Sequence, residues 1–163
     1  MNSINYELRI LMVCLGNICR SPMADGLLRR KVKDHNLNVF VDSAGTANYH
    51  IGSPPDHRMI ETAKSRGTDI QELRARQFSK NDFQDFDLIY VMDESNLSNV
   101  NMLTASDIEQ EKVKLILKEL YPNESMRVPD PYYGSMKDFM DVYDLLDKVT
   151  DVIIEKIKNG EIR

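Results

Sequence analysis

Short apolar runs alternate along the chain with longer stretches in which apolar residues recur every three or four positions. Four of the runs have the length and the bounding turn residues of buried strands, and we expect strands over 8–14, 38–43, 87–92 and 112–117. Four stretches have helical spacing, and we expect helices from about 21, over 54–66, over 94–103 and over 135–158. The last of these carries an apolar stripe of Phe139, Tyr143, Leu146, Val149, Ile153 and Ile157.

This alternation predicts an α/β fold, a three-layer sandwich in which helices cover both faces of a parallel sheet. The chain has no internal repeat and no linker, so we expect its 163 residues to form a single domain, with about residues 1–7 as a short N-terminal extension. Segment 121–134 is rich in proline and is expected to be a loop of about a dozen residues. Loops of that length in compact domains usually carry function.

Composition narrows the class of protein further. Apolar residues make up 42%, charged residues 29%, and the net charge is −5, as in an ordinary globular chain. The acidity argues weakly against a nucleic-acid partner, which usually requires a basic stripe. The longest apolar run, 10–15, is far short of the ~20 residues that span a bilayer, and residues 1–9 lack the apolar centre of a signal peptide. We therefore expect a cytoplasmic protein without a membrane span.

The two cysteines, Cys14 and Cys19, lie in one short segment. A disulfide across so short a loop would constrain the unfolded chain very little. The three histidines do not bracket the cysteines at the spacing of a zinc site, so we expect no metal and no cofactor. In a reducing compartment, free thiols point to chemistry more often than to structure.

The segment after the first expected strand has the composition of an oxyanion-binding loop. From residue 13 to residue 22 it is VCLGNICRSP. Free N–H groups at the start of the following helix attract anions, and Arg20 can clasp two oxygens of a tetrahedral oxyanion. Cys14 would then face a bound phosphate as a thiolate nucleophile. The expected phosphate-binding residues are Leu15, Gly16, Asn17, Ile18, Cys19 and Arg20.

Each cysteine also has a plainer interpretation. A cysteine six positions before an arginine arises by chance, and buried cysteines are common in strands. The full string favours catalysis, because Gly16 and Asn17 tolerate positive φ and Ser21 can hydrogen-bond to the sulfur. Cys19 either fills space or acts as a resolving thiol that traps oxidised Cys14 as a reversible disulfide.

This loop closely resembles the phosphate loop of the low-molecular-weight protein tyrosine phosphatases. The resemblance covers nearly the whole chain and continues through DSAGT (42–46), GSPPD (52–56), ARQ (75–77), MDESN (92–96) and DPYYG (130–134). It implies a four-stranded parallel sheet flanked by helices, with the phosphate-binding loop after the first strand. It also implies a cysteinyl-phosphate mechanism without metal, in which Ser43 braces the loop through Asn17.

Expelling a tyrosine oxygen from phosphorus requires a proton, because the pKa of a phenol is ~10. The acid must lie opposite the nucleophile, so another loop must supply it. Asp130 in the proline-rich loop is the candidate, and the resemblance assigns the general acid to it. The neighbouring Tyr132 and Tyr133 can wall a slot for an aryl ring, and the resemblance adds Tyr49 as another wall. Leu15 and Ile18 would form an apolar floor.

Several other polar residues give weaker signals. Some members of the family complete the loop network with a histidine before ARQ, whereas this chain has ELR at 72–74. Asp93 is expected either to organise the surroundings of the site or to cap the next helix. The remaining expectations are structural: His50 and His57 on the surface, and Arg66, Arg74 and Arg76 on a solvated face that could attract acidic partners.

The leading functional hypothesis is hydrolysis of phosphotyrosine in proteins, with tyrosine-phosphorylated proteins as partners and inorganic phosphate or a similar oxyanion in the site. A protein-arginine phosphatase is a close alternative, although its loop tends to carry threonine at the position of Ile18. An arsenate reductase would need further cysteines to relay a disulfide. A phosphoprotein-binding module without turnover fits poorly with Cys14, Arg20 and Asp130 together. The chain is expected to be a monomer or a weak dimer.

Overall fold

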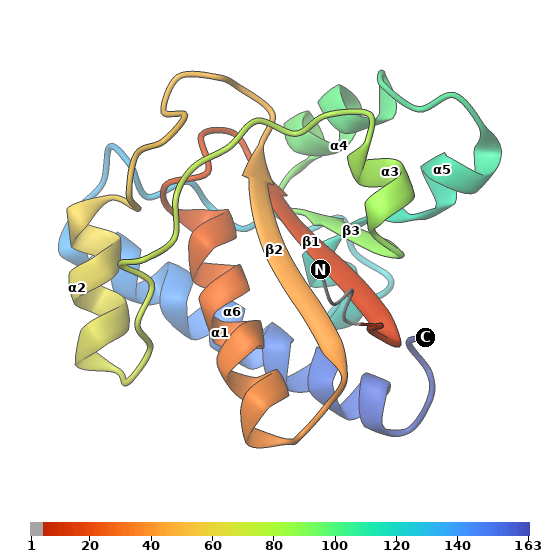
Figure 1. Cartoon of the computed structure of the whole chain (residues 1–163). Helices are drawn as coiled ribbons and strands as arrows, with labels where there is room; N and C mark the ends of the chain where they lie inside the picture. The colour runs from red at the N-terminus through yellow and green to blue at the C-terminus, as the bar shows by residue number, and fades with distance from the viewer. Residues whose placement is uncertain (1–4) are drawn as a thin grey trace.

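The computed structural model describes residues 5–163, so the expected N-terminal extension lies partly outside the described residues. Four strands form one sheet: β1 (Leu8–Cys14), β2 (Val39–Gly45), β3 (Leu88–Val91) and β4 (Val113–Leu115) (Figure 1). The helices are α1 (Arg20–Asp34), α2 (His57–Ser65), α3 (Asp82–Asp85), α4 (Glu94–Asn101), α5 (Asp107–Glu111) and α6 (Met136–Lys158), and a 3-10 turn, η1, spans Ile116–Glu119.

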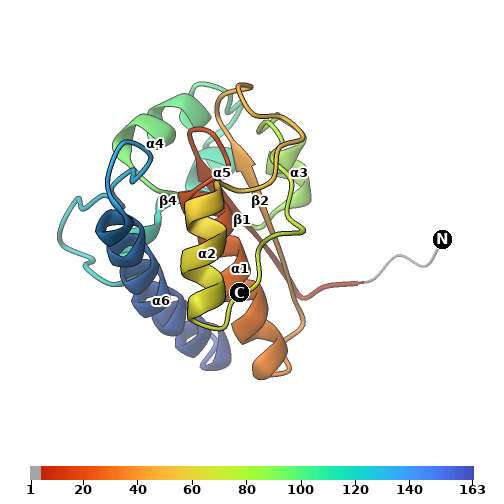
Figure 2. The ribbon, with the colours of Figure 1, turned by 90° about the vertical axis from the view of Figure 1, so that its left-hand side faces the viewer.

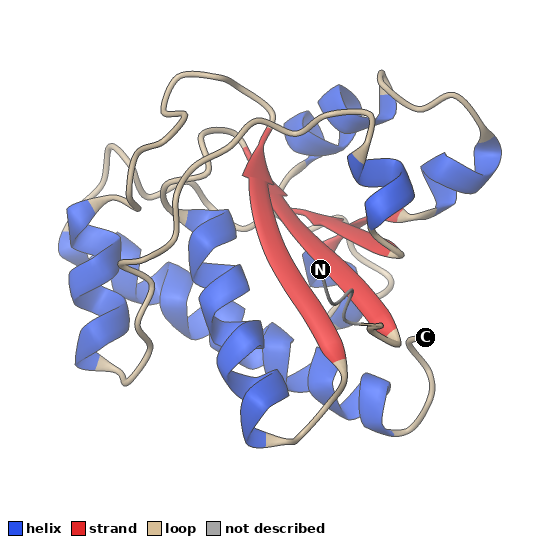
Figure 3. Ribbon diagram, in the orientation of Figure 1, coloured by secondary structure: helices blue, strands red, loops and turns tan. Residues whose placement is uncertain are grey.

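All strand pairs are parallel and the strand order is β2-β1-β3-β4, which confirms the predicted α/β fold with a four-stranded parallel sheet. The first strand of the chain is therefore an interior strand of the sheet. Its last residue, Cys14, lies in register with Gly45 at the end of β2. The loops that follow β1 and β2 thus leave the sheet at the same edge (Figure 3).

The two faces of the sheet have separate cores, because side chains alternate along a strand. Ile10 and Met12 of β1 pack with α1, α2 and α6, whereas Leu11 and Val13 pack with Phe83 and other residues of the opposite face. Turning the molecule shows α1, α2 and α6 together on one side (Figure 2). Both faces of β1 are buried, which explains why its sequence is an unbroken apolar run rather than an alternating one.

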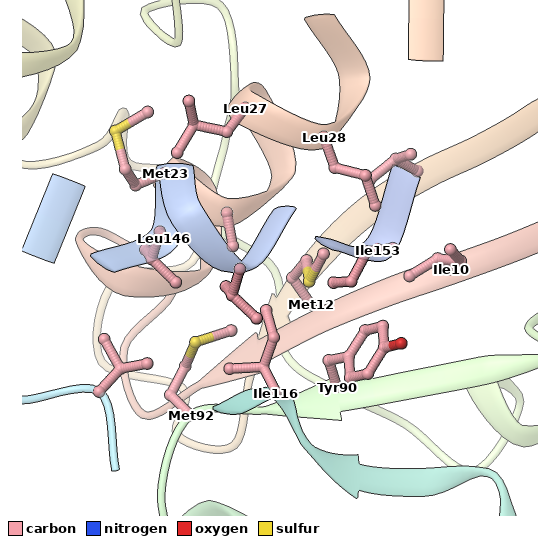
Figure 4. Packing of buried hydrophobic residues seen from close by; sticks show 14 of the residues in the cluster. Ile10, Met12, Met23, Leu27, Leu28, Tyr90, Met92, Ile116, Leu146 and Ile153 are labelled. Atoms are coloured by element: carbon pink, nitrogen blue, oxygen red, sulfur yellow. The ribbon is translucent and has the colours of Figure 1, made fainter. Parts of the chain in front are cut away.

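Helix α6 supplies much of the larger core. Its predicted apolar stripe is buried from Phe139 to Ile153, whereas Ile157 at its end is partly buried. Leu146 and Ile153 pack in one cluster with Leu27 and Met12, between the helices and the sheet (Figure 4). The helix begins after Ser135, whose N–H donates to the Asp138 carboxylate at 2.8 Å. That bond satisfies a backbone donor at the helix start and sets where the proline-rich loop ends.

Several elements differ from the sequence expectations. Helix α2 begins at His57 rather than at residue 54, because a proline disfavours helical backbone in the residue before it and Asp56 is the better N-cap. The fourth strand ends at Leu115, and Ile116 and Leu117 turn into η1 while staying buried. Helices α3 and α5 were not predicted, since four or five residues are too few to show a helical period.

Candidate active site

The loop after β1 brings the Cys14 sulfur to the start of α1. The Sγ atom lies 3.0 Å from the Ser21 hydroxyl and accepts the amide N–H of Asn17 at 3.3 Å. The Asn17 amide donates a hydrogen bond to the sulfur, and the Ser21 hydroxyl is close enough to donate another. In residues 5–163 we find no acceptor for the loop amides that could bind an oxyanion, which are those of Leu15, Gly16, Ile18 and Cys19.

Asn17 holds the shape of this loop. Its backbone has a positive φ of 57°, which asparagine tolerates better than most residues, and its side chain is buried. The side-chain amide donates to Ser21 Oγ at 2.8 Å and to Ser43 Oγ at 3.0 Å. Its carbonyl oxygen accepts the backbone N–H of Arg76 at 3.1 Å. The segment before ARQ therefore needs no histidine, because the main chain of Arg76 completes the network.

Gly45 allows the loop to lie against β2. A Cβ atom there would lie 2.7 Å from the Leu15 carbonyl oxygen and 3.1 Å from the Asn17 nitrogen, both backbone atoms that cannot swing away. The amide N–H groups of Thr46 and Ala47 donate to the carbonyls of Cys14 and Leu15, both at 2.9 Å. The sequence does not reveal this role of Gly45, since a close backbone approach leaves no periodic signal.

Asp25 in α1 lies directly behind this network. Its carboxyl group is fully buried, binds Arg29 at 2.9 Å and lies within hydrogen-bonding reach of the Ser43 hydroxyl. Burial raises the pKa of Asp25 to about 6, and the neighbouring Asp42 adds to the rise while Arg29 opposes it. A sequence pattern offers no sign of this group, because a lone aspartate within a helix is usually exposed.

Arg20 is buried and held from two sides. Its Nη1 donates to Asp93 Oδ2 at 2.6 Å and to the Val128 carbonyl at 3.2 Å, which leaves Nε and Nη2 for an oxyanion. Burial alone would lower the pKa of Arg20, but the Cys14 sulfur and the Asp93 and Asp130 carboxylates outweigh it and raise the pKa. Asp93 has both of its expected roles. It organises the site by binding Arg20, and it caps α4, because its Oδ1 accepts the Asn96 N–H at the start of that helix.

Asp130 approaches from the proline-rich loop. Its carboxylate lies 3.7 Å from Arg20 Nη2, is 43% exposed, and accepts the Tyr132 N–H at 3.1 Å. The rings of Tyr132 and Tyr133 meet edge to face, with their centroids 4.9 Å apart. This loop therefore places a carboxylate and two aromatic rings at the mouth of the phosphate loop.

A pocket of about 340 Å³ collects most of the predicted site residues. Its wall is formed by Cys14, Leu15, Gly16, Ile18, Cys19, Arg20, Tyr49, His50, Asp130, Tyr132 and Tyr133. Asn17, Ser21 and Ser43 lie behind this wall and brace the loop. In residues 5–163, no group of three or more His, Cys, Asp and Glu side chains could hold a metal ion.

Two structural expectations require correction. His50 is half-buried in the pocket wall rather than a simple surface residue, because the loop after β2 folds back over Gly16. Arg76 is not on a freely solvated face, since it pairs with Asp42 at 3.2 Å and with Asp82 at 3.0 Å. His57 is exposed and pairs with Glu61, as a surface residue would.

The two cysteines lie in different environments. Burial raises the pKa of the Cys19 thiol far above its ordinary value, and the Asp56 carboxylate and the Cys14 sulfur raise it further. Within residues 5–163, no hydroxyl is found at the Cys19 sulfur, whereas that of Ser21 approaches the Cys14 sulfur. Burial therefore favours the neutral thiol at Cys19, and the surroundings of the two cysteines differ.

Comparison with known proteins supports the same assignment over nearly the whole chain. The family model described as "Low molecular weight phosphotyrosine protein phosphatase" matches residues 9–161. The human protein of that name is 42% identical over 150 residues, covering 90% of this chain and 94% of its own length. The fission yeast protein of that name, from Schizosaccharomyces pombe, is 42% identical over 140 residues, covering 84% and 88%.

Solved structures agree with the sequence comparisons. A crystal structure of a protein tyrosine phosphatase from Entamoeba histolytica, with Hepes in its active site, has a TM-score of 0.88 and 34% identity, covering 96% of this chain and 100% of that one. A low molecular weight phosphotyrosine phosphatase from Vibrio cholerae has a TM-score of 0.85 and 30% identity, covering 95% and 99%.

Proposed function

Because this chain belongs to the low molecular weight phosphotyrosine protein phosphatase family, we propose that it hydrolyses phosphotyrosine in proteins through a cysteinyl-phosphate intermediate. One observation carries the proposal: the Cys14 sulfur, the Arg20 guanidinium and the Asp130 carboxylate line one pocket. A nucleophile, an oxyanion clamp and a general acid are the groups that phosphoryl transfer to a thiolate needs.

In the first step, the Cys14 thiolate attacks phosphorus and the bond from phosphorus to the tyrosine oxygen breaks. Arg20 binds two phosphate oxygens through Nε and Nη2, and the loop amides bind the others. Protonated Asp130 donates its proton to the departing phenolate, so that tyrosine leaves as a neutral phenol. Asp93 holds Arg20 in place through the 2.6 Å bond to Nη1 and does not line the pocket.

In the second step, the Asp130 carboxylate removes a proton from a water molecule that attacks the cysteinyl phosphate. The sulfur–phosphorus bond breaks and inorganic phosphate is released. Ser21, 3.0 Å from the sulfur, stabilises the departing thiolate by hydrogen bonding. Asp130 returns to its protonated form, and no metal or cofactor takes part in either step.

The walls of the pocket favour an aryl phosphate. Tyr49, Tyr132 and Tyr133 are exposed at its mouth and can enclose a phenol ring. Ile18 in the floor supports the same choice over phosphoarginine, the substrate of the closest alternative function. An arsenate reductase is disfavoured because Cys14 and Cys19 are the only cysteines in the sequence.

The proposed activity also leads to expectations about domain organisation, oligomeric state, partners and location. We propose a single catalytic domain, acting as a monomer or weak dimer on tyrosine-phosphorylated proteins in the cytoplasm, with inorganic phosphate as product and competitive ligand. Among residues 5–163, no helix has the length and apolar character that crossing a membrane requires. We also propose that, once a peroxide has oxidised Cys14 to a sulfenic acid, the Cys19 thiol attacks that sulfur and water leaves, which forms a disulfide, because both cysteines are buried in the same loop.

Steady-state hydrolysis of phenyl phosphate and of phosphotyrosine peptides tests this proposal. Cys14→Ser should reduce the rate to background, and Asp130→Asn should lower kcat/KM for phenyl phosphate by about 10²- to 10⁴-fold. Ser106→Ala, in the exposed cap of α5, is a control that should leave the rate unchanged. Normal turnover by Cys14→Ser would refute the mechanism, and faster release of phosphate from phosphoarginine peptides would refute the substrate.

A further inference from the structure

Arg58, in the first turn of α2, contacts the acid-bearing loop without lining the pocket. Its Nη2 donates to the carbonyl oxygen of Tyr132 at 2.9 Å. The guanidinium carbon also lies 5.6 Å from the centre of the Tyr132 ring. Arg58 therefore holds both the main chain and the side chain of one residue in that loop.

Tyr132 in turn holds the acid. Its carbonyl accepts from Arg58, and its amide N–H donates to Asp130 Oδ1 at 3.1 Å. In residues 5–163, the bond from Arg58 is the only hydrogen bond that joins the main chain of 129–134 to another element. The position of the Asp130 carboxylate thus depends on a contact made two residues further along the chain.

Arg58 is itself anchored to the phosphate loop. It makes two bonds to the Asp56 carboxylate, at 3.1 and 3.0 Å, and the Asp56 N–H donates to the Ile18 carbonyl at 2.7 Å. On its other side the guanidinium packs 4.5 Å from the centre of the Phe139 ring in α6. Ile18, Asp56, Arg58 and Tyr132 form a continuous bonded path from the phosphate loop to the acid loop.

We propose that Arg58 is a positioning residue that sets the distance between the general acid and the nucleophile by clamping Tyr132 to the phosphate loop. This inference rests on the proposed function and assigns to it a residue outside the pocket. Arg58 touches neither substrate nor reacting atoms. A lysine could keep the charge but could not bind Asp56 and the Tyr132 carbonyl with one planar group.

The test compares two substrates of one enzyme. Phenyl phosphate needs a proton on its leaving oxygen, whereas 2,4-dinitrophenyl phosphate releases an anion stable enough to leave without one. Arg58→Gln should lower kcat/KM for phenyl phosphate by about 10- to 100-fold, part of the full effect of a general acid, and change kcat/KM for the dinitrophenyl ester little. The readout is the ratio of kcat/KM for phenyl phosphate to kcat/KM for the dinitrophenyl ester. This ratio does not depend on how much of the sample is folded. Arg58→Lys should lower the ratio by a smaller factor.

Arg66→Gln is the matched control. Arg66 follows α2, its side chain is 34% exposed against 35% for Arg58, and it also reaches α6, where it pairs with Asp144 and stacks on Tyr143. Its replacement should leave the ratio unchanged. In an Asp130→Asn background, adding Arg58→Gln should no longer lower the ratio, because there is no acid left to position.

The possible failures are distinguishable. If Asp130→Asn lowers the ratio but Arg58→Gln does not, the positioning role is wrong and the proposed function stands. If Arg58→Gln lowers kcat/KM equally for both substrates, Arg58 acts on binding or folding and the positioning role is wrong. If Asp130→Asn leaves the ratio unchanged, or the enzyme hydrolyses neither ester, the proposed function itself fails and the inference with it.

Discussion

Two side chains in this site, those of Asp93 and Asn17, each form hydrogen bonds to more than one element. Asp93 uses one oxygen to cap α4 and the other to hold Arg20, and Asn17 uses its amide to join Ser21 and Ser43 while its carbonyl binds Arg76. A buried polar group is stabilised only when its hydrogen-bonding capacity is filled. Sharing one group between two elements fills that capacity with few buried residues.

The two roles of Asp93 are separable by mutation. Asp93→Asn should keep the N-cap of α4, because asparagine caps about as well as aspartate, but should remove the charge that pairs with Arg20. We expect kcat/KM for phenyl phosphate to fall, and the free energy of unfolding to fall by less than it does in Asp93→Ala. Asp93→Ala should lose both the N-cap of α4 and the ion pair with Arg20. Urea unfolding and steady-state kinetics measure the two effects, and equal stability losses in both variants would contradict the division of roles.

Asp25 should make stability depend on pH. Its folded-state pKa of about 6 exceeds that of an unfolded aspartate, so the folded chain holds this proton more tightly. As pH rises from about 4 to about 6, the unfolded carboxyl ionises first, and the group costs up to about 3 kcal/mol of stability at neutral pH. Asp25→Asn has no such titration. The stability of the variant relative to the parent should therefore rise by up to about 3 kcal/mol between pH 4 and pH 7.

Urea unfolding across that pH range checks this expectation. A stability difference between Asp25→Asn and the parent that stays flat with pH would show that burial does not perturb the Asp25 carboxyl.

At the residue level, the sequence predicted those site residues that belong to a recognisable motif. Cys14, Arg20 and Asp130 came from a motif and a resemblance, and the structure places all three in one pocket wall. His50 and Arg58 could not be found in this way. Their positions depend on how the loop after β2 and the start of α2 fold back over the site, and neither follows from local periodicity.

At the level of elements, the site depends on the contact between the phosphate loop and the end of β2. Gly45 makes that contact possible, so Gly45→Ala should push the loop away from its present position. We expect a loss of about 1–3 kcal/mol in unfolding free energy, typical of overpacking, together with a clear fall in kcat/KM. Phosphatase assays and urea unfolding of the purified variant measure both quantities.

Gly67→Ala is the control for Gly45→Ala. Gly67 has a φ of 84° after the end of α2 and no backbone close to where a Cβ would lie. An alanine there should cost about 1–2 kcal/mol through backbone strain and leave kcat/KM unchanged. If both variants lost only stability, the close approach at Gly45 would have no bearing on catalysis.

Elements with a long apolar pattern were predictable, whereas short ones were not. The strands and α6 followed from burial patterns that persist over many residues. Ile116 and Leu117 are as buried as strand residues, yet the chain turns there, because burial alone does not distinguish a strand from a buried turn.

For the molecule as a whole, the larger core stabilises the fold from the face opposite α3 and α4. Leu146, fully buried in α6, should cost about 2–5 kcal/mol when replaced by alanine, because it leaves a cavity. It lies outside the pocket wall, so kcat/KM per folded enzyme should stay within about twofold of the parent value. Thermal unfolding and active-site titration would separate the two effects. A large loss of kcat/KM would mean that α6 also controls the acid loop.

The interior position of β1 has a consequence for how the enzyme is made. This strand leaves the ribosome before the other three, yet one of its sheet neighbours, β3, begins only at Leu88, and Asp130, the proposed acid, follows later still. At ordinary rates of translation, roughly 6–23 s separate the synthesis of Cys14 from that of Asp130. During that interval the nascent chain carries both thiols without the pocket around them, so oxidants can reach Cys14, the proposed nucleophile, before the enzyme has turned over once.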